Sequence, residues 1–161
     1  KNRYFLTDSG AMKTGWLKDG NDWYYIDKSG SLRTGWINDG NTWYYLDGSG
    51  KMQTGWLDQN NQRYFLSPSG AMKTGWINVD KSWYYMNNSG SMTRGMINVN
   101  NVSYYFDESG KMLSNTTVNV NGTDYRIDAS GAMSQIVPET TSSPETSAAV
   151  STQASVGPTG N

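Results

Sequence analysis

Short aromatic runs alternate with polar stretches along most of the chain. Residues 43–47 have strong strand propensity because they are rich in aromatic side chains. The Gly-Ser-Gly segment at 48–50 supplies a turn, since glycine tolerates positive φ. Residues 51–56 are then expected to return as the second strand, and five or six polar residues link to the next unit. The pattern predicts a chain built from β-hairpins.

This hairpin unit is repeated about every twenty residues. Each copy has a Ser-Gly pair, at Ser9-Gly10, Ser29-Gly30, Ser49-Gly50, Ser69-Gly70, Ser89-Gly90 and Ser109-Gly110. A Gly-Trp pair recurs at residues 15–16, 35–36, 55–56 and 75–76, and Gly95-Met96 follows in the same register. A degenerate seventh copy with one extra residue ends at Ser130-Gly131. One hairpin is only marginally stable, whereas stacked hairpins bury a shared core, as in a solenoid.

Side-chain alternation divides each aromatic run between two faces. Trp23 and Tyr25 point to one face of a strand, and Tyr24 and Ile26 point to the other. The Tyr24 position stays aromatic in every copy, whereas the Trp23 position becomes polar in several, namely Arg3, Arg63, Ser103 and Asp124. We therefore predict that the Tyr24/Ile26 face forms the core and that the Trp23/Tyr25 face is free to vary with function.

Two longer-range features concern the organisation of the chain. Residues 3–16 return almost unchanged at 63–76, which indicates either three hairpins per superhelical turn or duplication of a three-unit block. Residues 138–161 are rich in Ser, Thr, Ala, Pro and Gly without aromatics, and are expected to be a disordered tail or linker. The repeat module is thus predicted to span residues 1–137. Because Lys1 falls inside a repeat, we expect the chain to be part of a longer protein.

Composition excludes several classes of function. Only 35% of the residues are hydrophobic, yet 7 Trp and 11 Tyr are present, so the apolar surface consists mostly of rings that favour half-buried positions. A net charge of −1 gives no signal for nucleic acid or an anionic membrane, and no apolar run is long enough to insert into a bilayer. Cysteine and histidine are absent, which removes thiolate metal ligands and the commonest general base. We expect no cofactor and no metal site.

The recurring carboxylates do not indicate an enzyme. Asp precedes the turn in several copies, where it is a routine turn residue, but Ser67 and Asn87 replace it in others. A catalytic acid would not tolerate that replacement. Neither a paired carboxylate constellation nor a nucleophile with a base is evident. We therefore expect a binding module, with no catalytic residues.

The repeat motif is Gly-Trp, then Trp-Tyr-Tyr after seven residues, then Ser-Gly-x-Met-x-Thr-Gly-Trp. It resembles the choline-binding repeats of Gram-positive, streptococcal-type surface proteins and cell-wall hydrolases, over residues 1 to about 135. Glucan-binding and clostridial toxin repeats share the skeleton but usually carry Lys-Tyr-Tyr where this chain has three copies of Trp-Tyr-Tyr. Choline is therefore favoured. A carbohydrate-binding module for glucan or host glycans and a structural adhesin stalk remain the alternatives.

The resemblance implies an all-β, left-handed β-solenoid with choline or phosphocholine held between consecutive hairpins. In the family, three rings and a Met or Leu line each site. Carried over by position, these sets are Trp16, Trp23, Tyr45 and Leu32; Trp36, Trp43, Phe65 and Met52; and Trp76, Trp83, Tyr105 and Met92. A fourth set, Trp56, Arg63 and Tyr85, has a guanidinium where a ring is expected, so it should be closed to choline. Either Arg63 stacks on Trp56, or this position accepts a phosphate or a sugar.

The chemistry of these side chains agrees with that expectation. A quaternary ammonium has no N–H to donate, so it is recognised by apolar contact and by the negative faces of aromatic rings. Several weak sites can add avidity on a polymer that carries many cholines. The implied partner is choline-bearing teichoic or lipoteichoic acid, and the implied location is the extracellular bacterial surface, with non-covalent attachment to the cell wall. Choline can promote homodimers in related modules.

Overall fold

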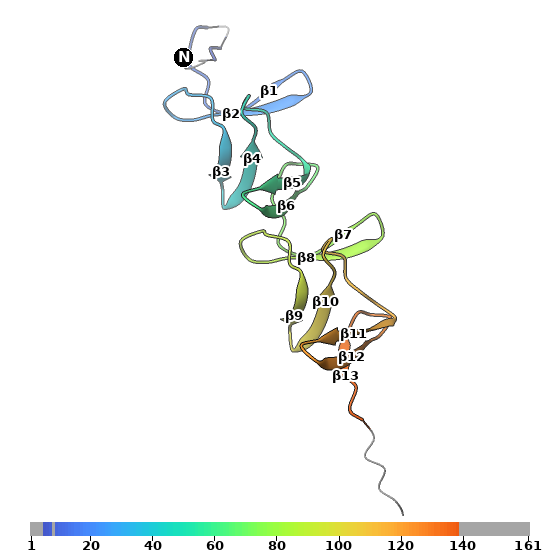
Figure 1. Cartoon of the computed structure of the whole chain (residues 1–161). Helices are drawn as coiled ribbons and strands as arrows, with labels where there is room; N and C mark the ends of the chain where they lie inside the picture. Colours follow the sequence, from blue (N-terminus) through green and yellow to red (C-terminus); the bar gives the residue numbers. More distant parts are fainter. Residues whose placement is uncertain (1–4, 8, 139–161) are drawn as a thin grey trace, which may run out of the picture.

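The computed structural model describes residues 5–7 and 9–138, which form an elongated column of β-hairpins without a helix (Figure 1). The first hairpin pairs β1 (Gly15–Asp19) with β2 (Asp22–Ile26). The next ones pair β3 (Gly35–Asp39) with β4 (Thr42–Leu46), β5 (Gly55–Gln59) with β6 (Gln62–Leu66), β7 (Gly75–Val79) with β8 (Ser82–Met86), and β9 (Gly95–Val99) with β10 (Val102–Phe106). The last sheet contains β11 (Thr116–Val120), β12 (Thr123–Ile127) and β13 (Met133–Gln135).

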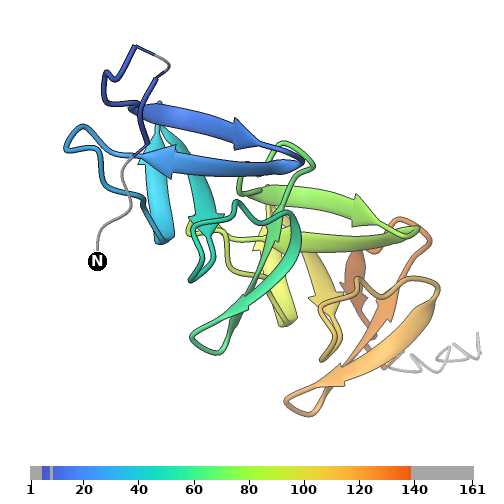
Figure 2. The same cartoon turned by 90° about the horizontal axis from the view of Figure 1, so that it is seen from above.

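The hairpins are separate small sheets that are stacked along the column. Hairpins three units apart point in the same direction: β1–β2 matches β7–β8, and β3–β4 matches β9–β10 (Figures 1 and 2). The predicted all-β architecture of repeated hairpins is confirmed. The predicted tail falls almost wholly on residues 139–161, which lie outside the described residues.

The pairing within each hairpin differs from the prediction. The aromatic strand pairs with the Gly-Trp strand that precedes it, so that Gly35 lies opposite Leu46 and Asp39 lies opposite Thr42. Gly40 and Asn41, with φ of 56° and 65°, form the connecting turn. Two consecutive positive φ values are what a type I′ hairpin turn requires. Residues 51–56 therefore do not form the expected second strand. After the 48–50 turn, residues 51–53 return against 45–47 only briefly, through an isolated bridge between Leu46 and Met52 and two backbone hydrogen bonds beside it.

The most deeply buried part of the core is one apolar side chain at the end of each aromatic strand. These side chains are no more than 1% exposed, and they are Ile26, Leu46, Leu66, Met86, Phe106 and Ile127. Further core side chains, at 4–8% exposure, are Ile37, Ile77, Tyr84 and Met92. Trp16 lies opposite Tyr25 and Lys18 lies opposite Trp23, so the predicted alternation of faces holds. The prediction that the Ile26 position is buried core is confirmed in the six copies from Ile26 to Ile127, whereas Leu6 at the first position is 60% exposed. The Tyr24 position has a second role, which the pockets described below reveal.

Consecutive hairpins are joined by a recurring backbone hydrogen bond. The Met52 N–H donates to the Trp23 carbonyl over 2.8 Å. The same bond recurs from Met72 to Trp43, from Met92 to Arg63 and from Met112 to Trp83. Glycine in the following turn leaves room for this methionine, because a Cβ at Gly70 would collide with the Met52 sulfur. Three successive units therefore meet around each of these methionines.

The turn after each aromatic strand is held by a polar side chain at its first residue. The Asp47 carboxylate accepts hydrogen bonds from the Ser49 N–H, the Ser49 hydroxyl and the Lys51 N–H, at 2.7–3.0 Å. Asn87 accepts the corresponding three bonds at 2.7–3.0 Å. A neutral acceptor thus serves the same turn.

These turns predict loss of stability in acid. Hydrogen bonds, first of all from the serine hydroxyl two residues on, lower the pKa of Asp27, Asp47 and Asp128. A carboxylate whose pKa is lowered by folding stabilises the protein above the unfolded value of about 4, and this contribution disappears as the pH falls through the folded pKa. We expect the melting temperature to fall as the pH drops below about 4 and these carboxylates become protonated.

The triple variant Asp27→Asn, Asp47→Asn, Asp128→Asn provides the matched control, because Asn87 already performs this role. Thermal unfolding of this variant should show a shallower dependence on acid pH than that of the wild-type chain. An equally steep fall in both proteins would place the acid sensitivity elsewhere.

Candidate functional site: aromatic pockets between hairpins

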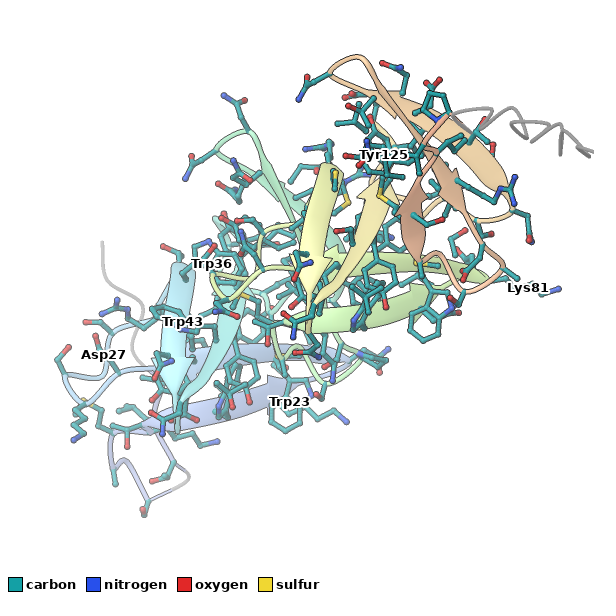
Figure 3. All side chains as sticks on the ribbon, turned by 90° about the horizontal axis from the view of Figure 1, so that it is seen from below. Trp23, Asp27, Trp36, Trp43, Lys81 and Tyr125 are labelled. Carbon is teal, nitrogen blue, oxygen red and sulfur yellow. The ribbon has the colours of Figure 1, made fainter. Side chains whose placement is uncertain are left out.

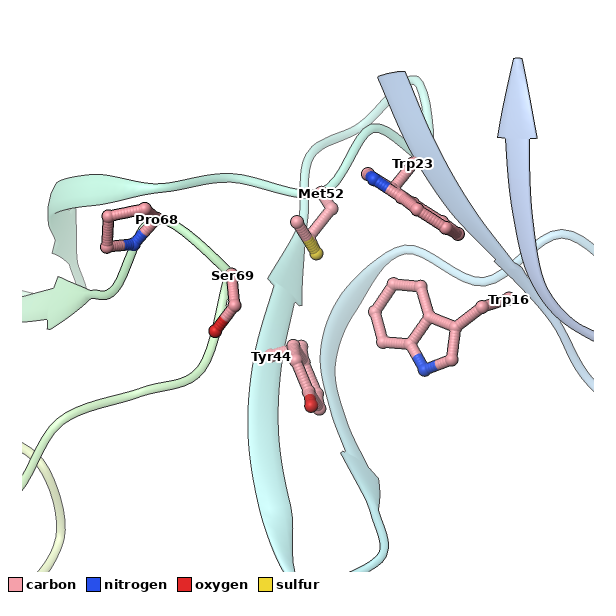
Figure 4. A pocket seen from close by; sticks show the side chains of 6 residues that line it. All are labelled: Trp16, Trp23, Tyr44, Met52, Pro68 and Ser69. Atoms are coloured by element: carbon pink, nitrogen blue, oxygen red, sulfur yellow. The ribbon is translucent and has the colours of Figure 1, made fainter. Parts of the chain in front are cut away.

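A half-open pocket of about 350 Å³ lies between the first and second hairpins and is called here the first pocket (Figure 4). β1 and β2 contribute Trp16 and Trp23, whereas Tyr44 comes from β4. Met52 closes the wall from the segment that follows β4, and the turn after β6 supplies the rim, Pro68 and Ser69. The pocket is therefore assembled from three successive units.

The same arrangement recurs at two further places. The second pocket, of about 420 Å³, is lined by Trp36, Trp43, Tyr64, Met72, Asn88 and Ser89. The third pocket, also of about 420 Å³, is lined by Trp76, Trp83, Tyr104, Met112 and Ser130. Each pocket has two tryptophans from one hairpin, a tyrosine from the next and a methionine after that tyrosine's strand. The repeat in the sequence thus becomes a repeat of similarly lined aromatic pockets.

The rings of a pocket meet edge to face, so that their faces line an open box. The Trp16 ring centroid lies 6.5 Å from that of Trp23, at 82°, and 4.7 Å from that of Tyr44, at 68°. The third pocket repeats this geometry, with Trp76 6.2 Å from Trp83 and 4.7 Å from Tyr104. The outer tryptophans are unusually exposed, at 39% for Trp23, 45% for Trp43 and 46% for Trp83. Figure 3 shows the Trp23 indole projecting at the edge of the column.

The structure brings together the predicted tryptophan pairs but replaces the predicted third ring. Tyr45 lies opposite Trp36 in its own hairpin, with ring centroids 5.2 Å apart, instead of lining the first pocket. Phe65 likewise packs on Trp56 at 5.0 Å, and Tyr105 lies opposite Met96. The rings that line the pockets are the middle ones of each run: Tyr44, Tyr64 and Tyr104. The Tyr24 type of position therefore both joins hairpins and lines pockets.

The predicted methionine and leucine walls are displaced by one unit. Met52 lines the first pocket, not the second, and Leu32 packs against the turn at Gly50. Met92 lies in the hydrophobic cluster where the third and fourth hairpins meet and does not line the third pocket. Met72 and Met112, which sequence reasoning missed, line the second and third pockets. A backbone hydrogen bond from the methionine N–H to the carbonyl of the outer tryptophan determines which methionine lines each pocket. The residue types in the sequence do not indicate this bond.

At the position between the second and third pockets, Arg63 covers the ring of Trp56. Its guanidinium lies over the Trp56 ring, 5.4 Å from the centroid. It also donates two hydrogen bonds to Asp58, at 2.8 and 3.0 Å, which lower the pKa of that carboxyl. Tyr84 and Met92, which correspond to a pocket's tyrosine and methionine, are only 8% and 4% exposed. Arg63 thus stacks on Trp56, as one of the two interpretations expected, and Tyr85 packs on Trp76 instead.

Other functional chemistry is sparse in the part of the chain that the structure describes. Within residues 5–7 and 9–138, no group of three or more acidic, cysteine or histidine side chains could hold a metal ion. No helix among these residues is long and apolar enough to cross a membrane. The aromatic pockets are therefore the most distinctive candidate site.

Family models match most of the hairpin column. A choline-binding repeat model matches residues 33–74 and 73–116, and a cell wall binding repeat model matches residues 14–32. The chain belongs to the choline-binding repeat family. The resemblance expected from the repeat motif is thereby confirmed. No curated protein matches the chain.

Solved structures of choline-binding proteins have the same fold. Choline-binding protein F from Streptococcus pneumoniae is 42% identical, with a TM-score of 0.74, over 82% of this chain and 44% of that chain. CbpJ from the same organism is 38% identical, with a TM-score of 0.76, over 83% and 49%. The modular autolysin LytC from S. pneumoniae is 26% identical, with a TM-score of 0.59, over 81% and 35%. This choline-binding repeat chain spans less than half the length of each of these proteins.

Proposed function

We propose that the chain is a non-catalytic cell-wall-binding module that holds choline or phosphocholine in the first, second and third pockets. One observation carries the proposal: a box of two tryptophans, one tyrosine and one methionine, repeated three times in a member of the choline-binding repeat family. A trimethylammonium group donates no N–H hydrogen bond, and its diffuse charge is attracted by ring faces. Methionine adds a polarisable apolar wall.

Repetition compensates for weak binding at a single pocket. One cation–π contact at an exposed site contributes about 0.5–1 kcal/mol, so three rings hold one choline only loosely. A polymer that carries many cholines can occupy several pockets at once, and each further contact is then intramolecular. We infer that choline-bearing teichoic and lipoteichoic acids are the partners, that attachment to the cell wall is non-covalent, and that the module works at the extracellular bacterial surface.

The wider architecture follows from the same proposal. Three hairpins would complete one turn of a left-handed β-solenoid, which agrees with the shared direction of hairpins three units apart (Figure 1). The binding module would span residues 1–137, and residues 138–161 would be a tail or linker. We also propose that choline promotes a homodimer, which sedimentation velocity with and without choline would detect as a shift to a faster species.

Retention on a tertiary-amine resin tests the proposed ligand. Choline should elute the protein, whereas the neutral isostere dimethylbutanol, which has carbon in place of the ammonium nitrogen, should not. The alternative function is carbohydrate binding, because the exposed tryptophans could also stack on sugar rings. Elution by a soluble glucan and not by choline would favour that alternative and overturn the choline proposal.

Choline should also stabilise the fold strongly. Each pocket is formed by consecutive hairpins and exists only in the folded state. A ligand that occupies three such independent pockets stabilises the folded state by about 4 kcal/mol at ten times its dissociation constant. We expect a rise in melting temperature that saturates with choline concentration. The triple variant Trp23→Ala, Trp43→Ala, Trp83→Ala provides the control, because it removes one exposed ring from each pocket. The rise should be lost in that variant, and an equal rise in both proteins would contradict binding at the pockets.

A further inference from the structure

The first pocket has a carboxylate bonded to one of its rings. The Trp16 indole N–H donates to Asp39 Oδ2 over 2.9 Å. Asp39 is the last residue of β3, so it reaches Trp16 from the next hairpin. The Tyr25 hydroxyl, which is opposite Trp16 in β2, approaches the other carboxylate oxygen at 3.5 Å. Burial, and after it the charge of Asp39, raises the pKa of Tyr25 above its usual value.

The other two pockets lack this carboxylate at the same position. The last residue of the corresponding strand is Gln59 for the second pocket and Val99 for the third. The Gln59 amide donates to the Tyr45 hydroxyl over 2.6 Å. The side chain of Val99 has no polar atom that could accept a hydrogen bond from the Trp76 indole N–H. The three boxes are therefore alike in their rings but differ in what lies at the edge of the inner tryptophan.

We propose that Asp39 is a positioning residue that raises the affinity of the first pocket for a quaternary ammonium group. A hydrogen bond to a charged acceptor is stronger than a neutral one, so it fixes the plane of the Trp16 ring. Negative charge at the indole N–H also makes the ring face more attractive to a cation. This inference rests on the proposed function of the pockets.

A cation of the protein itself acts in the opposite sense. Lys18 Nζ lies 5.9 Å from the Trp23 ring centroid, on the same face of the hairpin. Its charge repels a bound ammonium, whereas the Asp39 carboxylate attracts it. The contribution of Asp39 must therefore be measured by changing Asp39 alone, with Lys18 left in place, and not by ranking the three pockets.

A merely structural bond between hairpins is the alternative for Asp39, and ligand charge distinguishes the two roles. Choline and its neutral isostere dimethylbutanol have nearly the same shape. A structural defect in the Asp39→Asn variant would weaken both ligands equally at the first pocket. A loss of favourable charge would weaken choline more, so the ratio of the two affinities is the informative quantity.

The experiment is a titration followed through the indole N–H resonances of Trp16, Trp36 and Trp76. In Asp39→Asn we expect the preference of the first pocket for choline over dimethylbutanol to fall about 3- to 10-fold. The second and third pockets should be unchanged. The matched control is Asp19→Asn, which removes an exposed carboxylate at the same position one hairpin earlier. It should leave all three pockets as in the wild-type chain.

The outcomes separate this inference from the proposed function. An unchanged preference at the first pocket in Asp39→Asn, with normal choline binding at the other two, would overturn the role of Asp39 alone. Equal losses at all three pockets would also overturn it, because they would indicate a general loss of stability. Failure of choline to shift any of the three tryptophan resonances in the wild-type chain would instead contradict the proposed function.

Discussion

Replacing Tyr104 by leucine should weaken choline binding at the third pocket by roughly 2- to 30-fold, the equivalent of one lost cation–π contact of about 0.5–2 kcal/mol. Tyr104 lies 4.7 Å from Trp76, ring centroid to ring centroid, and lines the pocket with Trp83 and Met112. Leucine keeps apolar packing against the preceding hairpin but offers no ring face. The affinity at this pocket can be followed through the Trp76 indole resonance during a choline titration.

Tyr105→Leu is the matched control for this prediction. Tyr105 is the adjacent residue in β10, but it points to the other face and lies opposite Met96. It does not line the third pocket. Choline affinity there should therefore stay within about twofold of the wild-type value. A loss in Tyr105→Leu with none in Tyr104→Leu would reverse the assignment of the third ring and restore the one expected from the sequence.

Much of the fold could be predicted because each copy of the repeat shows the same alternation of apolar and polar residues. Alternation within the run from Trp23 to Ile26 identified the buried position correctly, since every copy keeps an apolar residue there. The pairing of strands was harder. Both the 40–41 and the 48–50 segments contain turn residues, and the sequence does not say which of them closes the hairpin. Two consecutive positive φ values at Gly40 and Asn41 decide it in the structure.

Only part of each pocket could be predicted from the sequence. The structure brings each expected tryptophan pair into one pocket, because both rings come from one hairpin, where spacing along the chain makes them neighbours. The third ring and the methionine come from other hairpins. Whether Tyr44 or Tyr45 supplies the third ring depends on which face of β4 is directed towards Trp16. That orientation is set by how the hairpins stack, and the sequence of one strand does not determine it.

Arg63→Trp should open a fourth choline pocket. Trp56 and Tyr84 already lie 4.9 Å apart, ring centroid to ring centroid, as Trp36 and Tyr64 do in the second pocket. The backbone bond that places the methionine is also present, from the Met92 N–H to the Arg63 carbonyl. Only the outer ring is missing, and a guanidinium covers the Trp56 face in its place. Equilibrium dialysis should therefore find four cholines per chain, compared with three in the wild type.

The loss of the Arg63–Asp58 ion pair should destabilise the chain too little to prevent measurement of the fourth choline site. Arg63 and Asp58 are 40% and 68% exposed at their side chains, and an ion pair this exposed is worth about 0–1 kcal/mol. Arg63→Leu is the control, since it removes the cation without adding a ring, and it should keep three sites. A folded Arg63→Trp chain that still binds three cholines would show that the buried Tyr84 and Met92 close this position by themselves. Four sites in Arg63→Trp and three in Arg63→Leu would show that two tryptophans and a tyrosine are enough to form a choline pocket where consecutive hairpins meet.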